Sequence, residues 1–462
     1  MEQRTDRVSW RTFLGLALPL LLPLSLRSVL NSAVAIADVL MLGRLGDTAL
    51  SAASLGGQVR LILTMVFSGL VSGASILIAQ YWGRGDRGTV ERVLAIALRF
   101  SLLIAVPALL VSLLTPGTVL RLYTDDPLLA AAGAEYLRYV SPAFPIMAVT
   151  DIYWGAVGAV GRVKASTAGR LLALGVNVAL NAVLIFGKLG FPALGVRGAA
   201  AATVCARLTE LLVMAVYCRR RRDIRIRPEL ILSRQGGLFR DFLRYAVPTT
   251  LNDLVWVTGY SMTGAILGRL GADAVAASSA ASQVREIMLS CSYGAAGASA
   301  VLVGTALGSG RLRLGEEYGR KMLALSALIG GAAGLLVLSA RPVLPGLLHL
   351  SAQAEEYTRY LLTVMAFFTV LQTVTTEINL GVFRAGGDPR FALILDFLAM
   401  WGVNVGLGAL SAFVFRWPAR VTLVLILSDE VVKLPILLWR YGKKIWVRDI
   451  TRPDPVLTDN TV

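Results

Sequence analysis

The chain has 462 residues, of which 56% are hydrophobic and 16% are charged, and its formal net charge at pH 7 is +16. Soluble globular proteins carry about 25% charged residues, so this composition excludes an ordinary soluble domain and indicates a protein embedded in a bilayer. The basic residues stand beside the ends of apolar segments, which membrane topology explains better than nucleic-acid binding does. We expect no nucleic-acid partner.

Apolar segments recur along the chain, and many approach or exceed the roughly 20 residues that cross a bilayer as a helix. Turn residues and charge clusters divide the chain into twelve predicted spans. The expected fold class is therefore an all-α polytopic membrane protein. The predicted spans cover 13–42, 49–80, 94–115, 131–158, 168–187, 198–218, 246–267, 274–305, 322–340, 356–382, 392–414 and 420–440.

The distribution of Arg and Lys predicts the orientation. Alternate loops on one side carry most of the basic residues, including Arg219–Arg222, whereas the opposite loops carry few. Both chain ends share the basic side through Arg4, Arg7 and Lys443, and cytoplasmic loops are the ones enriched in Arg and Lys. The first apolar segment is too long for a cleavable signal. We expect a multi-pass protein of the plasma membrane (the cell inner membrane) with both termini in the cytoplasm.

The two halves of the chain repeat each other at an offset of 225 residues. The tetrapeptide GRLG stands at 43–46 and 268–271, and QVR stands at 58–60 and 283–285. An even number of spans per half makes the copies parallel, so we expect two homologous six-helix lobes around a central cavity, as in transporters that move two bundles about a shared site. A duplicated bundle with a purely structural role is the alternative. The predicted domains are an N-terminal lobe at 1–218, a basic cytoplasmic linker at 219–245, a C-terminal lobe at 246–440 and a cytoplasmic tail at 441–462.

Asp38 stands within the first span, where a carboxylate is costly to bury. Asn31 lies seven residues earlier, on roughly the same helical face, and the stretch NSAVAIAD offers no basic neighbour. These features favour a proton or cation site over a carboxylate near the helix end that reaches water. Asn177 and Asn181 share a face of the fifth span, where they line a polar cavity or bond to a neighbouring helix.

The second half carries its carboxylates at other positions. Asp253 stands in the seventh span, Glu377 in the tenth and Asp396 in the eleventh, and they form a candidate second-lobe polar site. The repeat partner of Asp38 is Thr263, so the ionisable groups of the halves have diverged. A local partner is the alternative for each carboxylate. Two further span carboxylates are Asp151 and Glu286.

Other charged residues in spans have simpler explanations. Opposite charges three or four residues apart on a helix neutralise each other. Arg60 and Arg285 are repeat partners, which indicates a shared role in each half. Pairs of the neutralising kind are Arg207 with Glu210, and Lys433 with Asp429 or Glu430.

The sequence carries no catalytic signature. It has no GxSxG, HExxH or P-loop pattern, its one histidine is His349 in a predicted outer loop, and its three cysteines lack metal-ligand spacing. We therefore expect no enzyme, no metal site and no cofactor. A secondary transporter is the reading that remains, and a membrane-embedded enzyme is its rival from another class.

Four stretches resemble the multidrug and toxic compound extrusion (MATE) family, in order and in both halves. They are ADVLMLGRLGDTALSA at 37–52, GASILIAQYWGRGD at 73–86, NVALNAVLIFGKLGFPALGVRGAAAAT at 177–203 and GVFRAGGDPRF at 381–391. The resemblance implies a twelve-helix, two-lobed antiporter that exports cationic or amphipathic organic compounds in exchange for protons or sodium.

The resemblance also implies roles for individual residues. Asp38 matches the first-helix carboxylate of cation coupling, Asn177 matches a fifth-helix asparagine of the same site, and Thr203 matches a sixth-helix hydroxyl beside it. Asn181 completes this cation-coupling set, although many proton-coupled members have an aspartate there. Thr373 stands where sodium-coupled relatives have a tenth-helix aspartate, so their second-lobe sodium site is not expected here.

The expected function is thus cation-coupled export of an organic compound by alternating access. The expected partners are that small molecule and the lipid bilayer, the chain is expected to be a monomer, and the coupling ion is a proton or sodium. A flippase for a lipid-linked saccharide is the alternative, and it would need a basic cavity for a diphosphate. Basic residues are scarce in the first-lobe spans apart from Arg27, Arg60 and Arg99, and this scarcity counts against a flippase.

Overall fold

The computed structural model describes residues 8–221, 223–233, 236–347 and 350–451. These residues form helices joined by short connections, and no β-strand occurs within the described ranges. The expected all-α class is confirmed. Arg4, Arg7, Arg222, His349 and the end of the tail lie outside the described residues.

The first lobe contains eight helices. The predicted fourth span is divided into α5 and α6 at Ser141 and Pro142, where proline has no backbone N–H to continue the hydrogen-bond ladder. The helices are α1 (Trp10–Gly43), α2 (Asp47–Arg84), α3 (Arg87–Leu114), α4 (Pro116–Arg121), α5 (Pro127–Val140), α6 (Ala143–Ala159), α7 (Val163–Leu184) and α8 (Val196–Arg221).

The second lobe departs from regular α-helix in its tenth and eleventh spans. Three π-helical segments, η1, η2 and η3, continue α14 and α15, and such wide turns often occur at functional positions. The short α9 (Pro228–Leu232) connects the lobes. The second-lobe elements are α10 (Gly236–Arg269), α11 (Ala272–Gly308), α12 (Leu312–Ala340), α13 (Leu344–Leu347), α14 (Ala352–Thr376), η1 (Glu377–Phe383), α15 (Pro389–Phe397), η2 (Leu398–Leu407), η3 (Leu410–Val414), α16 (Ala419–Leu425) and α17 (Asp429–Gly442).

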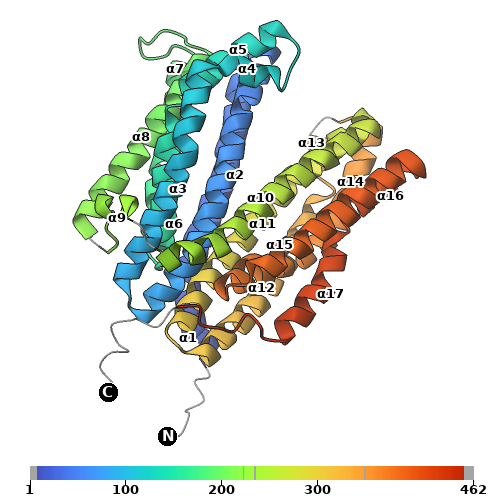
Figure 1. Cartoon of the computed structure of the whole chain (residues 1–462). Coiled ribbons are helices and arrows are strands. Elements are labelled where there is room, and N and C mark those ends of the chain that lie inside the picture. The colour runs from blue at the N-terminus through green and yellow to red at the C-terminus, as the bar shows by residue number, and fades with distance from the viewer. Residues whose placement is uncertain (1–7, 222, 234–235, 348–349, 452–462) are drawn as a thin grey trace, which may run out of the picture.

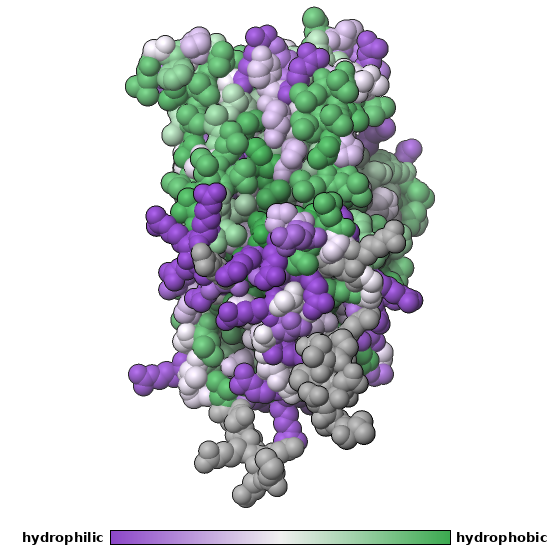
Figure 2. All heavy atoms as spheres, turned by 60° about the vertical axis from the view of Figure 1, so that its left-hand side comes forward, coloured by the Kyte–Doolittle hydropathy of each residue, from purple (hydrophilic) through white to green (hydrophobic). Residues whose placement is uncertain are grey.

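Nine of the described helices are long and apolar enough to cross a membrane. The remaining three predicted spans correspond to the shorter α6, to α10, and to the broken pair α16 and α17. The chain is therefore an integral, multi-pass membrane protein, and twelve helical segments are consistent with the prediction. Figure 2 shows hydrophobic residues over much of the upper part of one face and hydrophilic residues gathered over its lower half.

The two lobes meet at one end and separate at the other (Figure 1). Helix α2 packs against α10, and α1 packs against α11. We call the joined end, which includes the start of α1 at Trp10 and the α2 segment from Gly69 to Gly83, the closed end. The opposite end, which includes the α1–α2 turn at Leu45–Gly46 and the α10–α11 turn at Leu270–Gly271, is the open end.

Glycines allow the lobes to approach so closely at the closed end. A Cβ atom on Gly69 would lie 2.2 Å from Cα of Thr250, and one on Gly73 would lie 2.3 Å from Cα of Ala246. Gly294 of α11, the repeat partner of Gly69, would meet Oγ of Ser25 at 2.0 Å. Small residues four positions apart let membrane helices pack backbone to backbone, so the same device joins the lobes at both crossings.

Candidate functional site: the cavity between the lobes

A cavity of about 930 Å³ lies between the lobes. Its wall comes mainly from α1, α2, α6, α7 and α8, with α11 and η1 closing the second-lobe side. Asp38, Asn31, Asn177 and Thr203 all line it. A cavity of this size accommodates a drug-sized organic molecule.

The structure brings Asp38 of α1 together with two amides of α7. Nδ2 of Asn181 donates a hydrogen bond of 2.6 Å to Oδ1 of Asp38, and a second of 3.3 Å to Oδ1 of Asn177. Both asparagines are buried, and Oδ1 of Asn181 has no hydrogen-bond partner among the described residues. Thr203 lies in the cavity wall, where its hydroxyl donates to the backbone oxygen of Ala199 at 3.0 Å.

The equivalent position in the second lobe is neutral. Thr263, the repeat partner of Asp38, donates a hydrogen bond of 2.8 Å to Oδ1 of Asn404. A hydroxyl and an amide keep the polar contact between helices but do not ionise near neutral pH. Each lobe thus has a polar pair that joins two helices near the related positions 38 and 263, and only the first lobe supplies a carboxylate there.

A cluster of opposite charges joins α6, α7 and α8 of the first lobe. Asp151 of α6 accepts ion pairs from Arg170 at 3.2 Å and from Arg207 at 3.7 Å. Glu210 pairs with Arg207 at 2.7 Å and with Nε of Arg170 at 4.0 Å. The predicted Arg207–Glu210 pair is present, but it belongs to a cluster that joins three helices.

The second-lobe candidates do not form one site. Asp253 pairs with Arg384 at 3.2 Å, whereas Asp396 accepts hydrogen bonds from Asn252 at 2.8 Å and from Asn379 at 2.7 Å. None of the three candidate carboxylates lines the central cavity as the described residues enclose it. The predicted pairing of Lys433 is present and extends to a third carboxylate, with distances of 2.7 Å to Glu430, 3.0 Å to Asp429 and 3.7 Å to Asp396.

Glu377 stands apart from that network. It is fully buried at the first position of η1, and its Oε2 accepts a hydrogen bond of 3.0 Å from Ser326 of α12. It forms no ion pair with the basic residues that the structure describes. Its other oxygen has no hydrogen-bond partner among them.

The gathering of several basic side chains in one cavity is the main feature that sequence reasoning missed. The expectation that Arg27, Arg60 and Arg99 are the basic residues of the first-lobe spans is wrong, because Arg170 and Arg207 also face the cavity. Both were visible inside predicted spans. The signal that could have found them is the cost of a charge in an apolar helix, which marks such residues as functional or paired.

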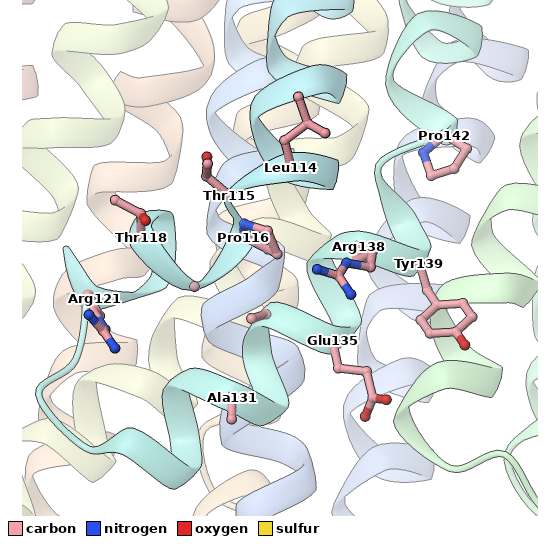
Figure 3. Close-up of a pocket in the computed structure, with 12 residues that line it drawn as sticks. Leu114, Thr115, Pro116, Thr118, Arg121, Ala131, Glu135, Arg138, Tyr139 and Pro142 are labelled. Atoms are coloured by element: carbon pink, nitrogen blue, oxygen red, sulfur yellow. The ribbon is translucent and has the colours of Figure 1, made fainter.

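A second hollow, of about 770 Å³, lies outside the gap between the lobes, near α4 and α5 (Figure 3). Its charged residues are Arg121, Glu135 and Arg138, and Glu135 pairs with Arg197. None of the predicted site residues contributes to it. The central cavity is therefore the candidate functional site.

Two lobes of membrane helices around a cavity with buried polar groups define a polytopic membrane transporter. Residues 23–183 and 248–410 match the MatE family model, one match in each lobe, and the chain belongs to this family. It is a transporter of the multidrug and toxic compound extrusion type.

Relatives match most of the chain. The probable multidrug resistance protein YoeA of Bacillus subtilis is 26% identical over 392 residues, which cover 83% of this chain and 84% of that protein. The probable multidrug resistance protein NorM of Rhizobium meliloti is 29% identical over 425 residues, which cover 89% of this chain and 88% of that protein.

Solved structures share the fold. One described as an outward-facing conformation of a multidrug resistance MATE family transporter has a TM-score of 0.85 at 21% identity, covering 93% of this chain and 95% of that one. A transporter of the MOP superfamily from Pyrococcus furiosus, described as having a binding pocket of reverse polarity, also has a TM-score of 0.85, at 20% identity, covering 94% and 96%.

Proposed function

We propose that this chain is an ion-coupled antiporter that exports amphipathic organic compounds by alternating access, with Asp38 as the group that binds the coupling ion. The observation that carries the proposal is the setting of Asp38. It lines the central cavity, forms no ion pair with the described residues, and is held by the neutral amide of Asn181. Carboxylates inside transporter cavities are typical ion sites.

The surroundings of Asp38 suit a proton or sodium. A carboxylate alone accepts a proton, while the oxygens of Asp38, Asn177 and Asn181 together offer ligands of the kind that hard cations prefer. Hydrogen bonds to an ionised acceptor are roughly twice as strong as neutral ones. Ion binding therefore weakens the contact between Asp38 and Asn181, which joins α1 to α7, and so links ion occupancy to the position of α1.

The arrangement of the lobes supplies the alternating access. With both termini in the cytoplasm, as the positive-inside rule predicts, the closed end faces the cytoplasm and the cavity opens outward. In this state Asp38 takes up its ion from outside while the substrate leaves. Because binding at the two sites is linked, the ion lowers the affinity for substrate by the same factor as the substrate lowers the affinity for the ion.

We assign different roles to the second-lobe carboxylates. Asp253 has Arg384 as a fixed counter-ion, and Asp396 is held by two amides and Lys433, so both stabilise helix packing. Glu377 is a fully buried carboxylate without a cationic partner among the described residues, so it keeps the capacity to ionise or bind a proton. We further propose that the protein lies in the plasma membrane and works as a monomer.

The test uses proteoliposomes loaded with amphipathic dyes, on which a pH gradient and a sodium gradient are imposed separately. Wild type is expected to move dye with one of the two gradients, and Asp38→Asn is expected to lose that dependence. Asp126→Asn is the matched control, because Asp126 caps the exposed start of α5 and asparagine caps helices equally well. Gradient-driven transport by Asp38→Asn at the wild-type rate would remove Asp38 as the coupling group.

A further inference from the structure

The charges that line the central cavity do not balance. Five arginines and three carboxylates of the described chain face it. Cavities lined by one sign of charge attract ligands of the opposite sign. The lining arginines are Arg27, Arg60, Arg170, Arg207 and Arg384, and the lining carboxylates are Asp38, Asp151 and Glu210.

Three of the five arginines have carboxylate partners within ion-pair distance. Arg170 and Arg207 share Asp151 and Glu210, as described above. Arg384 pairs with a carboxylate outside the cavity lining, Asp253, at 3.2 Å. Two arginines are left for the one remaining carboxylate, Asp38.

Of these two, Arg60 has Asp38 within electrostatic range. Arg27 lies within range of Asp151, Glu210 and Arg170, whose mutual pairs are already formed. It makes no ion pair and no hydrogen bond with any residue that the structure describes. Neither Arg27 nor Arg60 forms an ion pair with the described residues, but only Arg60 has an otherwise unpaired carboxylate, Asp38, within electrostatic range; the carboxylates in range of Arg27 already pair with Arg170 and Arg207.

The position of Arg27 places it at the floor of the cavity. It lies two residues after Ser25, which packs against Gly294 of α11 at the closed end. Arg27 and Asp38 are eleven residues apart on α1, which corresponds to about 16 Å along the helix axis. Eleven residues are also close to three full turns, so the two side chains share the face that lines the cavity.

A guanidinium in a membrane-spanning helix is costly without a partner, and it binds carboxylate, sulfonate or phosphate groups through two parallel N–H donors. The rest of the cavity wall is mostly apolar. Side chains of this wall are Leu24, Leu61, Met65, Val71, Trp154 and Leu380. The combination matches a molecule with an apolar body and an anionic group.

We propose that the transported compound is an amphipathic organic anion whose acidic group binds Arg27 at the cavity floor, about 16 Å along α1 from Asp38. This inference rests on the proposed function and replaces the cationic substrate class that the family resemblance implies. The anion site and the ion site thus lie apart on the same helix, and movement of α1 links them.

The first test compares two dyes with the same xanthene body, anionic carboxyfluorescein and cationic rhodamine 6G, in equilibrium binding to purified protein by fluorescence anisotropy. Wild type is expected to bind carboxyfluorescein at least about tenfold more tightly. Arg27→Gln is expected to lose about tenfold in affinity for carboxyfluorescein and to leave rhodamine 6G unchanged, since a charged hydrogen bond contributes about that much. Arg27→Lys is expected to fall between the two.

The matched control is Arg44→Gln, which removes the same charge from the exposed end of the same helix, outside the cavity lining. Preference of wild type for rhodamine 6G overturns the inference even if Arg27→Gln fails to fold. Carboxyfluorescein binding that is unchanged in folded Arg27→Gln also overturns it. Absence of gradient-driven transport of either dye is a different result, because it contradicts the proposed function and leaves the binding comparison to decide the charge preference.

A second experiment distinguishes a soluble anion from a lipid headgroup, which carry the same chemistry. Vesicles containing fluorescent NBD-phosphatidylglycerol are treated with dithionite, which bleaches the dye in the outer leaflet. Flipping that wild type accelerates and Arg27→Gln does not would assign the anion to a lipid. Dye binding that depends on Arg27, without such flipping, would assign a soluble compound, and independence of both from Arg27 would contradict the inference.

Discussion

The side-chain amide of Gln80 donates a hydrogen bond of 2.8 Å to the backbone oxygen of Ala385, and so joins α2 of the first lobe to the loop that follows η1 in the second. Its oxygen accepts a hydrogen bond of 2.9 Å from the backbone N–H of Ile450. The segment that ends the described chain thus crosses the closed end, anchored by the buried Trp446. Gln80 is fully buried, so opening this end must break these bonds.

Replacement of Gln80 by leucine is expected to shift the protein toward the conformation that opens at the closed end. The change leaves the Ala385 oxygen and the Ile450 N–H without their partner, which costs about 1–3 kcal/mol for each buried group. Spin labels at positions 44 and 269, repeat partners at the open end, would report the shift as a shorter distance between the lobes. Gln353→Leu, at an exposed position of α14, is the control. An unchanged distance distribution in Gln80→Leu would show that these bonds do not hold the closed end.

The glycines of α2 predict a second effect at the same interface. Gly69→Ala places a Cβ atom 2.2 Å from Cα of Thr250, so the lobes must separate locally. Such overpacking is expected to lower the free energy of unfolding by about 1–3 kcal/mol, measured by thermal unfolding in detergent. Gly57→Ala in the same helix meets no atom within 4 Å and is expected to be neutral or stabilising. Equal stability of the two variants would contradict the close crossing.

The bond between Asn181 and Asp38 is expected to set the rate of transport. Asn181→Ala removes a donor to a charged acceptor at 2.6 Å, and such bonds contribute about 1.5–3 kcal/mol. We expect the initial rate of gradient-driven dye efflux to fall by about tenfold or more in proteoliposomes. Gln353→Ala removes an amide at an exposed position of α14, outside the cavity lining, so it serves as the control. Similar rates in both variants would show that the α1–α7 bond is dispensable.

The cluster of Arg170, Arg207, Asp151 and Glu210 predicts a strong dependence of stability on charge balance. Arg170→Gln leaves its carboxylate partners in excess. Breaking a fully buried pair costs about 3–5 kcal/mol, and a smaller loss is expected for this partly buried pair. The double variant Arg170→Gln with Asp151→Asn removes one charge of each sign and is expected to recover part of that loss. Chemical unfolding of the two single variants and the double variant measures the coupling. Additive losses would mean that Arg170 and Asp151 do not interact.

The sequence predicted the helical spans and the repeat because both depend on local patterns. Apolar runs of membrane length identify themselves, and the GRLG and QVR pairs place the two copies in register. The pair Arg207–Glu210 could be predicted for the same reason, since three residues on one helix determine its geometry.

Contacts between distant helices were beyond that kind of reasoning. The bond from Asn181 to Asp38 joins residues 143 positions apart, and Arg384 reaches Ser72 across the lobes at 2.5 Å. Which carboxylate pairs with which arginine depends on how the helices pack, and no local pattern encodes it. For that reason the sequence could not show that Asp253 has a counter-ion or that Arg27 lacks one.

The most direct test of the central claim is the reverse of gradient-driven export. Proteoliposomes receive a gradient of transported dye and no ion gradient, while a pH-sensitive or sodium-sensitive fluorophore follows the lumen. Since linkage is reciprocal, the dye gradient is expected to drive the coupling ion in the opposite direction through wild type, and Asp38→Asn is expected to carry no such ion flux. An ion flux through Asp38→Asn equal to that of wild type would contradict the account.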